Sequence, residues 1–162
     1  MNKPSAAHVI QPPNTLKLKV GGGGFGGIDA AAVARAEEAL KGLSAQFGQW
    51  LNDELTKLDA ARADIRTVGY STHTADALYM RAHDLKGLGA TYEYPLVTRM
   101  AGSLCKLIEA EVRMRAPLFL IDAHIDAIKA AVRDQIQTDE HPVGRALAEE
   151  LERKTAEHLA SL

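Results

Sequence analysis

The sequence has one cysteine, few aromatic residues and no long apolar run, and each shortage excludes a class of protein. Cys105 has no partner for an internal disulfide, and no CxxC pair or Cys/His cluster forms a zinc site. Aromatic residues make up 5% of the chain, while alanine and leucine dominate, a balance that favours an all-α protein over a β-sandwich or barrel. A run of about 18 apolar residues is absent, so we expect no membrane span.

A large excess of charge of one sign is also absent. The formal net charge is −2 and no basic run occurs, which argues against binding to nucleic acid or to anionic lipid. No apolar segment follows a basic start, so no signal peptide is expected. With 162 residues, of which 46% are hydrophobic, the chain can bury one core. We therefore expect a cytoplasmic monomer.

The N-terminal region is rich in proline and glycine and has no helical period. The segment 16–20 alternates like a strand, and the glycines of 21–27 that follow it satisfy G-x-G-x-x-G. No second strand follows to complete a βαβ unit, and no Gly-Lys-Ser/Thr occurs. Glycines this dense match the pattern by chance, and a flexible linker is the better interpretation. We assign 1–27 to a flexible arm with a Gly-rich linker and 28–162 to a helical domain.

Apolar residues recur at helical spacing through the rest of the chain. In the first helix the stripe shifts by one residue after Trp50, and Gly42 and Gly48 leave open a break near residue 48. Short connections predict antiparallel neighbours, and the last helix is polar enough to lie outside the others. The prediction is an antiparallel up-down four-helix bundle (core 29–137) with an extra C-terminal helix (142–160). The expected helices are 29–66, 72–90, 95–115, 118–137 and 142–160; the two parts of the first stripe are Val33, Ala36, Leu40, Leu43, Phe47, Trp50 and then Leu51, Leu55, Leu58, Arg62, Ile65.

One face of the second predicted helix combines residues suited to phosphoryl transfer. His83, Lys86 and Gly87 stand at positions i, i+3 and i+4, which meet on one side of a helix. An imidazole can carry the phosphoryl group, and a lysine ammonium screens its charge. Glycine leaves the backbone uncovered, so that a partner can approach closely. A solvated histidine at the edge of the apolar stripe is the plainer interpretation of these residue types alone.

The neighbouring sequence makes the phosphoryl-transfer interpretation more specific. Ala-His-Asp-Leu-Lys-Gly at 82–87, a turn, and a helix ending in Leu-Cys-Lys-Leu-Ile-Glu at 104–109 resemble the histidine phosphotransfer (HPt) domains of bacterial multistep phosphorelays. That family has the signature A-H-x-L-K-G and an antiparallel four-helix bundle. The resemblance implies that His83 is the phosphoacceptor, that Lys86 neutralises phosphoryl oxygens, and that Gly87 admits the receiver.

The resemblance also implies which partners, metal ions and cofactors the reaction would use. The partners would be the receiver domain of a hybrid histidine kinase and a response regulator, and the receiver would supply Mg²⁺. The chain would need no cofactor or metal ion of its own, and without an ATP-binding domain it would be a phosphoryl carrier and not a kinase. Further receiver-facing residues implied in this way are Tyr79, Arg81, Ala90, Cys105, Lys106 and Glu109.

Two departures from the family pattern leave questions for the structure. Glu93 stands where the family usually has a glycine ten residues after the histidine, so the turn must be made differently. The second departure is that the Leu-Cys-Lys-Leu-Ile-Glu segment lies about one helical turn later than in many members of the family. Either Cys105 or Glu109 could therefore occupy the position that faces the histidine. Arg81, Lys86, Arg99 and Lys106 could surround it with positive charge, whereas His73 and His124 are expected to be structural or exposed.

Two alternative functions remain. A helical adaptor could bind a receiver or kinase without carrying phosphate, with Glu93 as a sign of a degenerate turn. A histidine-dependent phosphohydrolase would need a substrate pocket and a general acid, and the sequence indicates neither.

Overall fold

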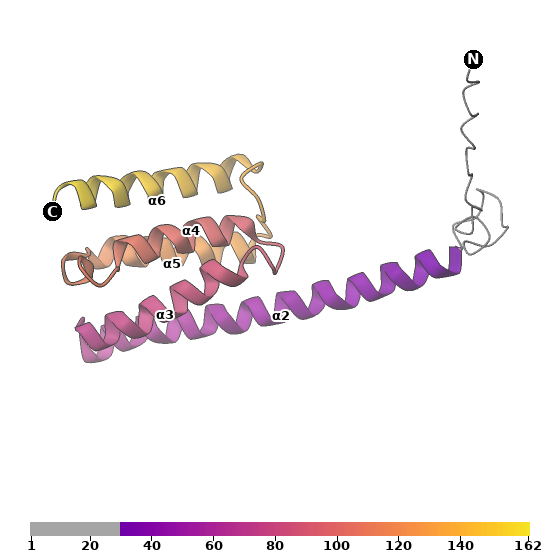
Figure 1. The fold of residues 1–162 in the computed structure, drawn as a ribbon, viewed down its shortest axis with the longest axis horizontal. Helices are drawn as coiled ribbons and strands as arrows, with labels where there is room; N and C mark the ends of the chain where they lie inside the picture. The colour runs from indigo at the N-terminus through magenta and orange to yellow at the C-terminus, as the bar shows by residue number, and fades with distance from the viewer. Residues whose placement is uncertain (1–29) are drawn as a thin grey trace, which may run out of the picture. The chain divides into compact units, whose positions relative to one another are not determined.

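The computed structural model describes residues 30–162, in which all regular structure is helical (Figure 1). The predicted all-α class is confirmed for this part of the chain. The chain divides into two compact units, Met1–Ala39 and Leu40–Leu162. The predicted arm, its boundary at 27 and the predicted start of the first helix at 29 lie outside the described residues. The helices are α2 (Ala30–Val68), α3 (Thr72–Leu88), α4 (Pro95–Leu107), the 3₁₀ turn η1 (Arg113–Arg115), α5 (Leu118–Arg133) and α6 (Pro142–Ala160).

Helix starts follow from local sequence. Ser71 caps α3 through a reciprocal pair of bonds: the Thr74 amide donates to Ser71 Oγ over 3.3 Å, and the Ser71 amide donates to Thr74 Oγ1 over 2.9 Å. Pro95 and Pro142 occupy the first turns of α4 and α6, where a missing amide hydrogen costs nothing. These three starts agree with the prediction, and α2 runs unbroken through Gly48.

The turn between α3 and α4 contains the residue that departs from the family pattern. Glu93 has φ of 65°, in the left-handed region. The Tyr94 amide donates to the Gly89 carbonyl over 2.8 Å, and the Glu93 amide donates to the Ala90 carbonyl over 3.2 Å. This pair of bonds is the Schellman arrangement, in which glycine usually takes the left-handed position. The turn is therefore regular in its hydrogen bonding, with glutamate in the glycine position.

Helix α4 ends at Leu107, eight residues before the predicted end at 115. The chain turns after Ile108 and brings Arg113 back to the start of α3, where its guanidinium donates to Asp76. The Tyr70 hydroxyl donates to the Arg113 carbonyl over 2.6 Å. These tertiary contacts outweigh the helix propensity of the intervening residues, which is why sequence spacing overestimated the helix.

Helix α5 is also shorter than predicted, ending at Arg133 and not at 137. Gln135 has φ of 55°, and the Ile136 amide donates to the Ala131 carbonyl over 2.8 Å, so the helix closes with the same kind of left-handed turn as α3.

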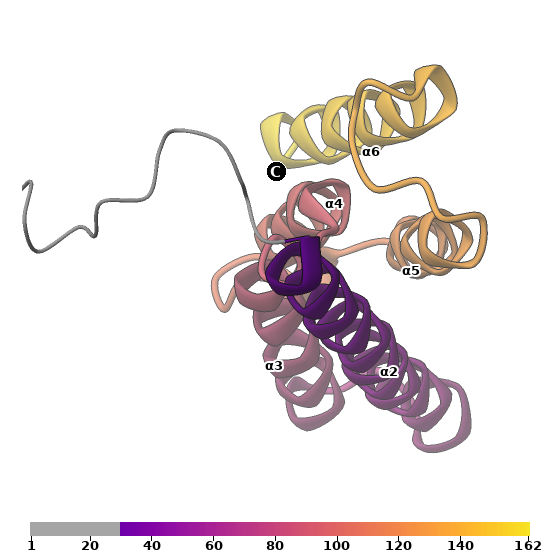
Figure 2. The same ribbon diagram turned by 90° about the vertical axis from the view of Figure 1, so that its right-hand side faces the viewer.

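Helix α4 is the central element of the Leu40–Leu162 unit. It packs against α3, α5 and α6, and α5 also contacts α6 (Figure 2). The buried residues of α2, α3, α4 and α5 form one apolar cluster with two residues of α6. The largest fully buried side chains are Leu51, Leu58, Leu78, Leu85, Leu96, Met100, Leu104, Leu107, Ile108, Ile121, Ile125 and Ile128.

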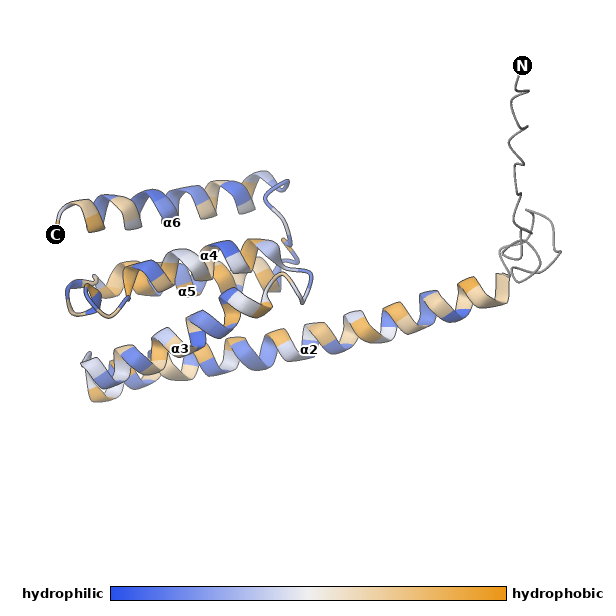
Figure 3. Cartoon of the chain, in the orientation of Figure 1, coloured by the Kyte–Doolittle hydropathy of each residue, from blue (hydrophilic) through white to orange (hydrophobic). Residues whose placement is uncertain are grey.

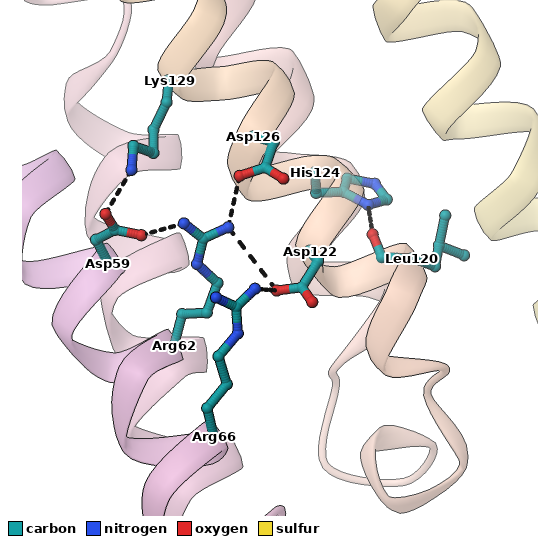
Figure 4. Close-up of polar contacts among 8 residues, drawn as sticks. All are labelled: Asp59, Arg62, Arg66, Leu120, Asp122, His124, Asp126 and Lys129. Carbon is teal, nitrogen blue, oxygen red and sulfur yellow. Dashed lines mark hydrogen bonds and ion pairs between the residues drawn. The ribbon is translucent and has the colours of Figure 1, made fainter.

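Ion pairs hold the second half of α2 beside α5 (Figure 4). Arg62 Nη1 donates to Asp126 over 2.5 Å, and Arg66 donates to Asp122 over 3.1 Å. Asp59 accepts from both Arg62 and Lys129, and the hydrogen bond from Lys129 is the main cause that lowers the pKa of the Asp59 carboxyl. Exposed pairs contribute little individually, so this network chiefly fixes which faces of the two helices meet.

The first part of the α2 stripe does not join the core. Leu51, Leu55 and Leu58 are buried, but Leu40 is 63% exposed and Trp50 is 45% exposed. Figure 3 shows apolar residues recurring along this part of α2. Spacing predicts an apolar stripe correctly here, but it does not reveal how far along the helix the neighbouring helices extend.

Helix α6 packs on the core mainly through small residues. Val143 is 53% exposed, whereas Gly144, Ala148, Leu151 and Thr155 are buried. A Cβ added at Gly144 would lie 2.7 Å from side-chain carbons of both Ile136 and Leu96. Small residues thus allow α6 to approach the other helices closely, and an apolar-residue count overlooks them. No helix within 30–162 is both long and apolar enough to cross a lipid bilayer.

Candidate functional site

His83 lies on the outer surface of α3, held in register by the core. The side chains on either side of it along the helix, Ala82 and Leu85, are fully buried, and His83 itself is exposed. Its ring stacks on that of Tyr79, with centroids 6.0 Å apart and planes inclined by 29°. The imidazole is therefore accessible and is supported on one face by an aromatic ring from the preceding turn.

Lys86 leans from α3 towards α4. A Cβ added at Gly102 of α4 would lie 3.7 Å from Cδ and 3.8 Å from Cγ of Lys86, so the lysine stem passes over this glycine. The ammonium charge also acts on Cys105 of α4, where it opposes the rise in pKa of the thiol. Sequence analysis missed Gly102; a glycine in the interior of a 13-residue helix is the signal that could have identified it.

Gly87 is exposed on α3, and a Cβ added there would meet nothing within 4 Å. Gly87 is the next-to-last residue of α3, and glycine at an exposed helical position costs up to roughly 0.5–1 kcal/mol relative to alanine. The fold therefore gives no packing reason for this glycine.

Cys105 and Glu109 do not share one helical stripe, because α4 ends at Leu107. Cys105 is buried, and burial is the main cause that raises the pKa of its thiol, with Glu109 adding to the rise. Glu109 is exposed in the segment after the helix. The helix does not reach Glu109, and which of the two residues faces His83 stays a prediction.

The charged residues considered around the histidine have different surroundings. Arg81 pairs with Asp84 on its own helix over 3.4 Å. Arg99 binds Glu152 of α6 through two hydrogen bonds of 2.8 and 2.7 Å, so an acidic partner in its own chain already pairs with its charge. Lys106 is exposed and helps to lower the pKa of Glu152, although Arg99 is the main cause.

Ala90 is exposed at the end of α3, where its amide donates to Thr98 Oγ1 over 2.8 Å. The receiver-facing set implied by the resemblance thus contains five residues that are exposed or half-buried and one, Cys105, that is buried.

A second histidine, His124, is fully buried, so of the two expectations for it, structural or exposed, the structural one is confirmed. His124 of α5 has Nδ1 2.7 Å from the Leu120 carbonyl and Nε2 2.9 Å from Ser103 Oγ of α4. Thr155 of α6 completes the group, its hydroxyl 3.1 Å from that of Ser103. Because a carbonyl only accepts, Nδ1 carries the proton and Nε2 accepts from a hydroxyl.

This environment determines the charge of His124. Burial is the main cause that lowers the pKa of its ring, and the bond to Leu120 opposes the shift only in part. The ring is neutral and serves to join three helices. Its position between Ile121 and Ile125 on the apolar face of α5 is the sequence signal for burial.

No group of three or more His, Cys, Asp or Glu side chains among residues 30–162 is arranged to hold a metal ion. The site thus consists of an exposed histidine, a lysine whose stem crosses to α4, and an uncovered glycine. Such a surface can present a nucleophilic nitrogen to a second protein. Comparison with models of known families, with curated proteins and with solved structures gives no match for this chain.

Proposed function

We propose that this protein is a histidine phosphotransfer protein of a two-component phosphorelay. His83 accepts a phosphoryl group from a receiver-domain aspartate of a hybrid histidine kinase and passes it to a response regulator. The observation that carries the proposal is the exposed His83 on a helix whose opposite side is fully buried. In this proposal α2 to α5 form the four-helix bundle of the HPt family, and α6 is an added helix.

The reaction requires little of this chain beyond position and charge. The lone pair of a ring nitrogen of His83 attacks phosphorus, and the bond from phosphorus to the receiver's carboxylate oxygen breaks with its electrons on that oxygen. The imidazolium formed loses its remaining proton to water. The Lys86 ammonium stabilises charge on the phosphoryl oxygens, while Mg²⁺ belongs to the receiver's own site. Return to a second receiver is the same step reversed.

Gly87 supports the proposal independently of the histidine. Neither packing nor backbone conformation in 30–162 requires glycine there, and alanine would favour the helix. A partner that must approach the backbone beside His83 supplies the missing reason. Tyr79 supports the ring, and its stacking limits the rotamers that His83 can adopt, which reduces the entropy lost on transfer.

The proposal is tested by phosphoryl transfer from radiolabelled, phosphorylated receivers of the source organism. We expect wild-type protein to drain label from its cognate receiver and to hold it as an acid-labile, base-stable phosphate. His83→Gln should abolish this transfer, and Lys86→Ala should slow it by about tenfold or more. Lys57→Ala, which removes an exposed lysine of α2, is the matched control and should transfer normally.

The proposal fails if no receiver loses its label or if His83→Gln accepts label as well as wild type. Receiver binding that survives His83→Gln, with transfer absent in both proteins, would instead establish the adaptor function. We expect the protein to act in the cytoplasm.

A further inference from the structure

Among residues 30–162, the exposed part of the α2 stripe is the largest group of exposed apolar side chains on one helix. Leu40 is 63%, Leu43 45% and Trp50 45% exposed, and Phe47 is half-buried. Their spacing of 3, 4 and 3 is that of a coiled-coil seam. The sequence carries the same spacing back to Ala36 and Val33. Isolated apolar residues on a surface are ordinary, but a regular seam of them indicates a partner.

The seam lies on the side of α2 that forms the core farther along. Phe47 and Leu51 are four residues apart, as are Leu51 and Leu55, so the same side passes from exposed to buried. The change occurs at an aromatic cluster in which the ring centroids of Phe47 and Trp50 lie 5.9 and 6.1 Å from that of Tyr92. Tyr92 belongs to the α3–α4 turn, which marks the limit of packing along α2 within the Leu40–Leu162 unit.

We propose that this seam binds the same seam of a second copy, with the two α2 helices antiparallel. Bulk along the seam is uneven: Val33 and Ala36 are small, the two leucines are intermediate, and Phe47 and Trp50 are large. In an antiparallel pair, residues whose numbers add up to 83 oppose each other. Trp50 then faces Val33, Phe47 faces Ala36, and the leucines face each other, so each layer has similar volume.

A parallel pair does not fit the same helix. It would set two tryptophans against each other and two alanines against each other, leaving overpacked and empty layers. It would also bring together the sides of α2 beyond Leu51, which each chain already covers with its own helices. An antiparallel pair uses only the segment from 33 to 50, roughly 27 Å of helix at 1.5 Å per residue. The expected monomer is replaced by a two-fold symmetric dimer.

The first test is the mass of the intact protein in solution, by light scattering after size exclusion. A dimer of micromolar affinity is predominantly assembled at about 100 µM protein. We expect a mass near twice 17.5 kDa for wild type and near 17.5 kDa for the double variant Leu40→Glu, Leu43→Glu. Val68→Glu, which changes a 78% exposed residue at the other end of α2, is the control and should stay dimeric.

The double variant should retain the helical circular dichroism of wild type, since the two leucines are exposed. A monomeric wild type at that concentration, as would result if another segment of the chain covered the seam, overturns the proposal. A dimer that persists in the double variant overturns it as well.

Cysteine crosslinking tests the orientation, in a Cys105→Ala background. An equimolar mixture of Ala36→Cys and Phe47→Cys proteins should form a disulfide-linked heterodimer, because these positions oppose each other in an antiparallel pair. Phe47→Cys protein alone should not crosslink. Crosslinking of Phe47→Cys alone, without the mixed product, would show a parallel pair and overturn the antiparallel arrangement.

Discussion

Glu93 carries a backbone conformation that ordinarily belongs to glycine. A side chain in the left-handed region brings Cβ close to the following carbonyl, at a cost of roughly 1–2 kcal/mol. The two turn hydrogen bonds around Glu93 are nevertheless formed, and its side chain is exposed. The strain is therefore confined to this one residue, and the relation of α3 to α4 is unaffected.

Replacing Glu93 by glycine should stabilise the protein. Glycine removes the steric cost but adds about 0.5–1 kcal/mol of unfolded-state entropy, so we expect a net gain of about 0.5–1 kcal/mol. Urea unfolding followed by circular dichroism measures this difference. Glu93→Ala removes the same charge without relieving the backbone and should show no comparable gain. Equal stability of the two variants would mean that the glutamate charge, and not the backbone, sets the cost.

The candidate site could be predicted from sequence at the level of single residues because apolar spacing fixes register. Ala82 and Leu85 belong to the buried stripe of α3, and a helix that buries both must expose His83. Side-chain contacts between two helices could not be predicted from apolar spacing. The stem of Lys86 passes over Gly102 only because α4 lies there, and a single sequence does not record which residues of two helices meet.

At the scale of elements, two nearby glycines of the α3 C-terminal region have opposite structural demands. Gly87 faces open space, whereas a Cβ added at Gly89 would lie 2.7 Å from Thr98 Oγ1 and 2.8 Å from the Thr98 amide nitrogen. The amide is backbone and cannot rotate away. Gly89 therefore sets how closely α3 can approach the start of α4.

Alanine at these two positions should separate stability from function. We expect Gly89→Ala to destabilise by about 1–3 kcal/mol through overpacking, and Gly87→Ala to stabilise by roughly 0.5–1 kcal/mol through helix propensity. Thermal unfolding measures both, and a loss of stability in Gly87→Ala would show that the fold itself requires that glycine. In the transfer assay, Gly87→Ala should be slow although it is well folded.

Element boundaries show where local sequence stops being informative. Ser71, Pro95 and Pro142 predict helix starts because caps act within one turn. The early ends of α4 and α5 depend on contacts of Arg113 with Asp76 and on a left-handed Gln135, and neither follows from periodicity. The buried face of α6 does not follow from large apolar residues alone, because Gly144 and Ala148 are part of it.

At the scale of the whole Leu40–Leu162 unit, His124 joins three helices that the apolar core also joins. Ser103 of α4 and Thr155 of α6 are buried, and the ring supplies the acceptor that their hydroxyls need. Loss of a hydrogen-bond partner by any of these three buried side chains would cost free energy. The network therefore favours the register of α6 that places Thr155 beside Ser103 over registers shifted along the helix.

The same group makes the stability of the protein depend on pH. Because burial lowers the pKa of His124 in the folded state, the unfolded chain binds a proton first as the pH falls below about 6.5. Above that pH neither state is protonated, and the residue adds no pH dependence. Below it, the free energy of unfolding should decrease by up to about 1.4 kcal/mol per pH unit, until the folded pKa is reached.

Urea unfolding between pH 8 and pH 5 (about the range over which an ordinary histidine titrates) measures this slope. His124→Leu keeps an apolar side chain and leaves the Ser103 and Thr155 hydroxyls paired with each other, so it should lose most of the slope that wild type shows below pH ~6.5. Ser103→Ala keeps the buried ring and removes one partner, so it should be less stable at every pH while retaining the slope. If His124→Leu keeps the full wild-type slope, protonation of other groups destabilises the fold, and the joint between α4, α5 and α6 is insensitive to pH.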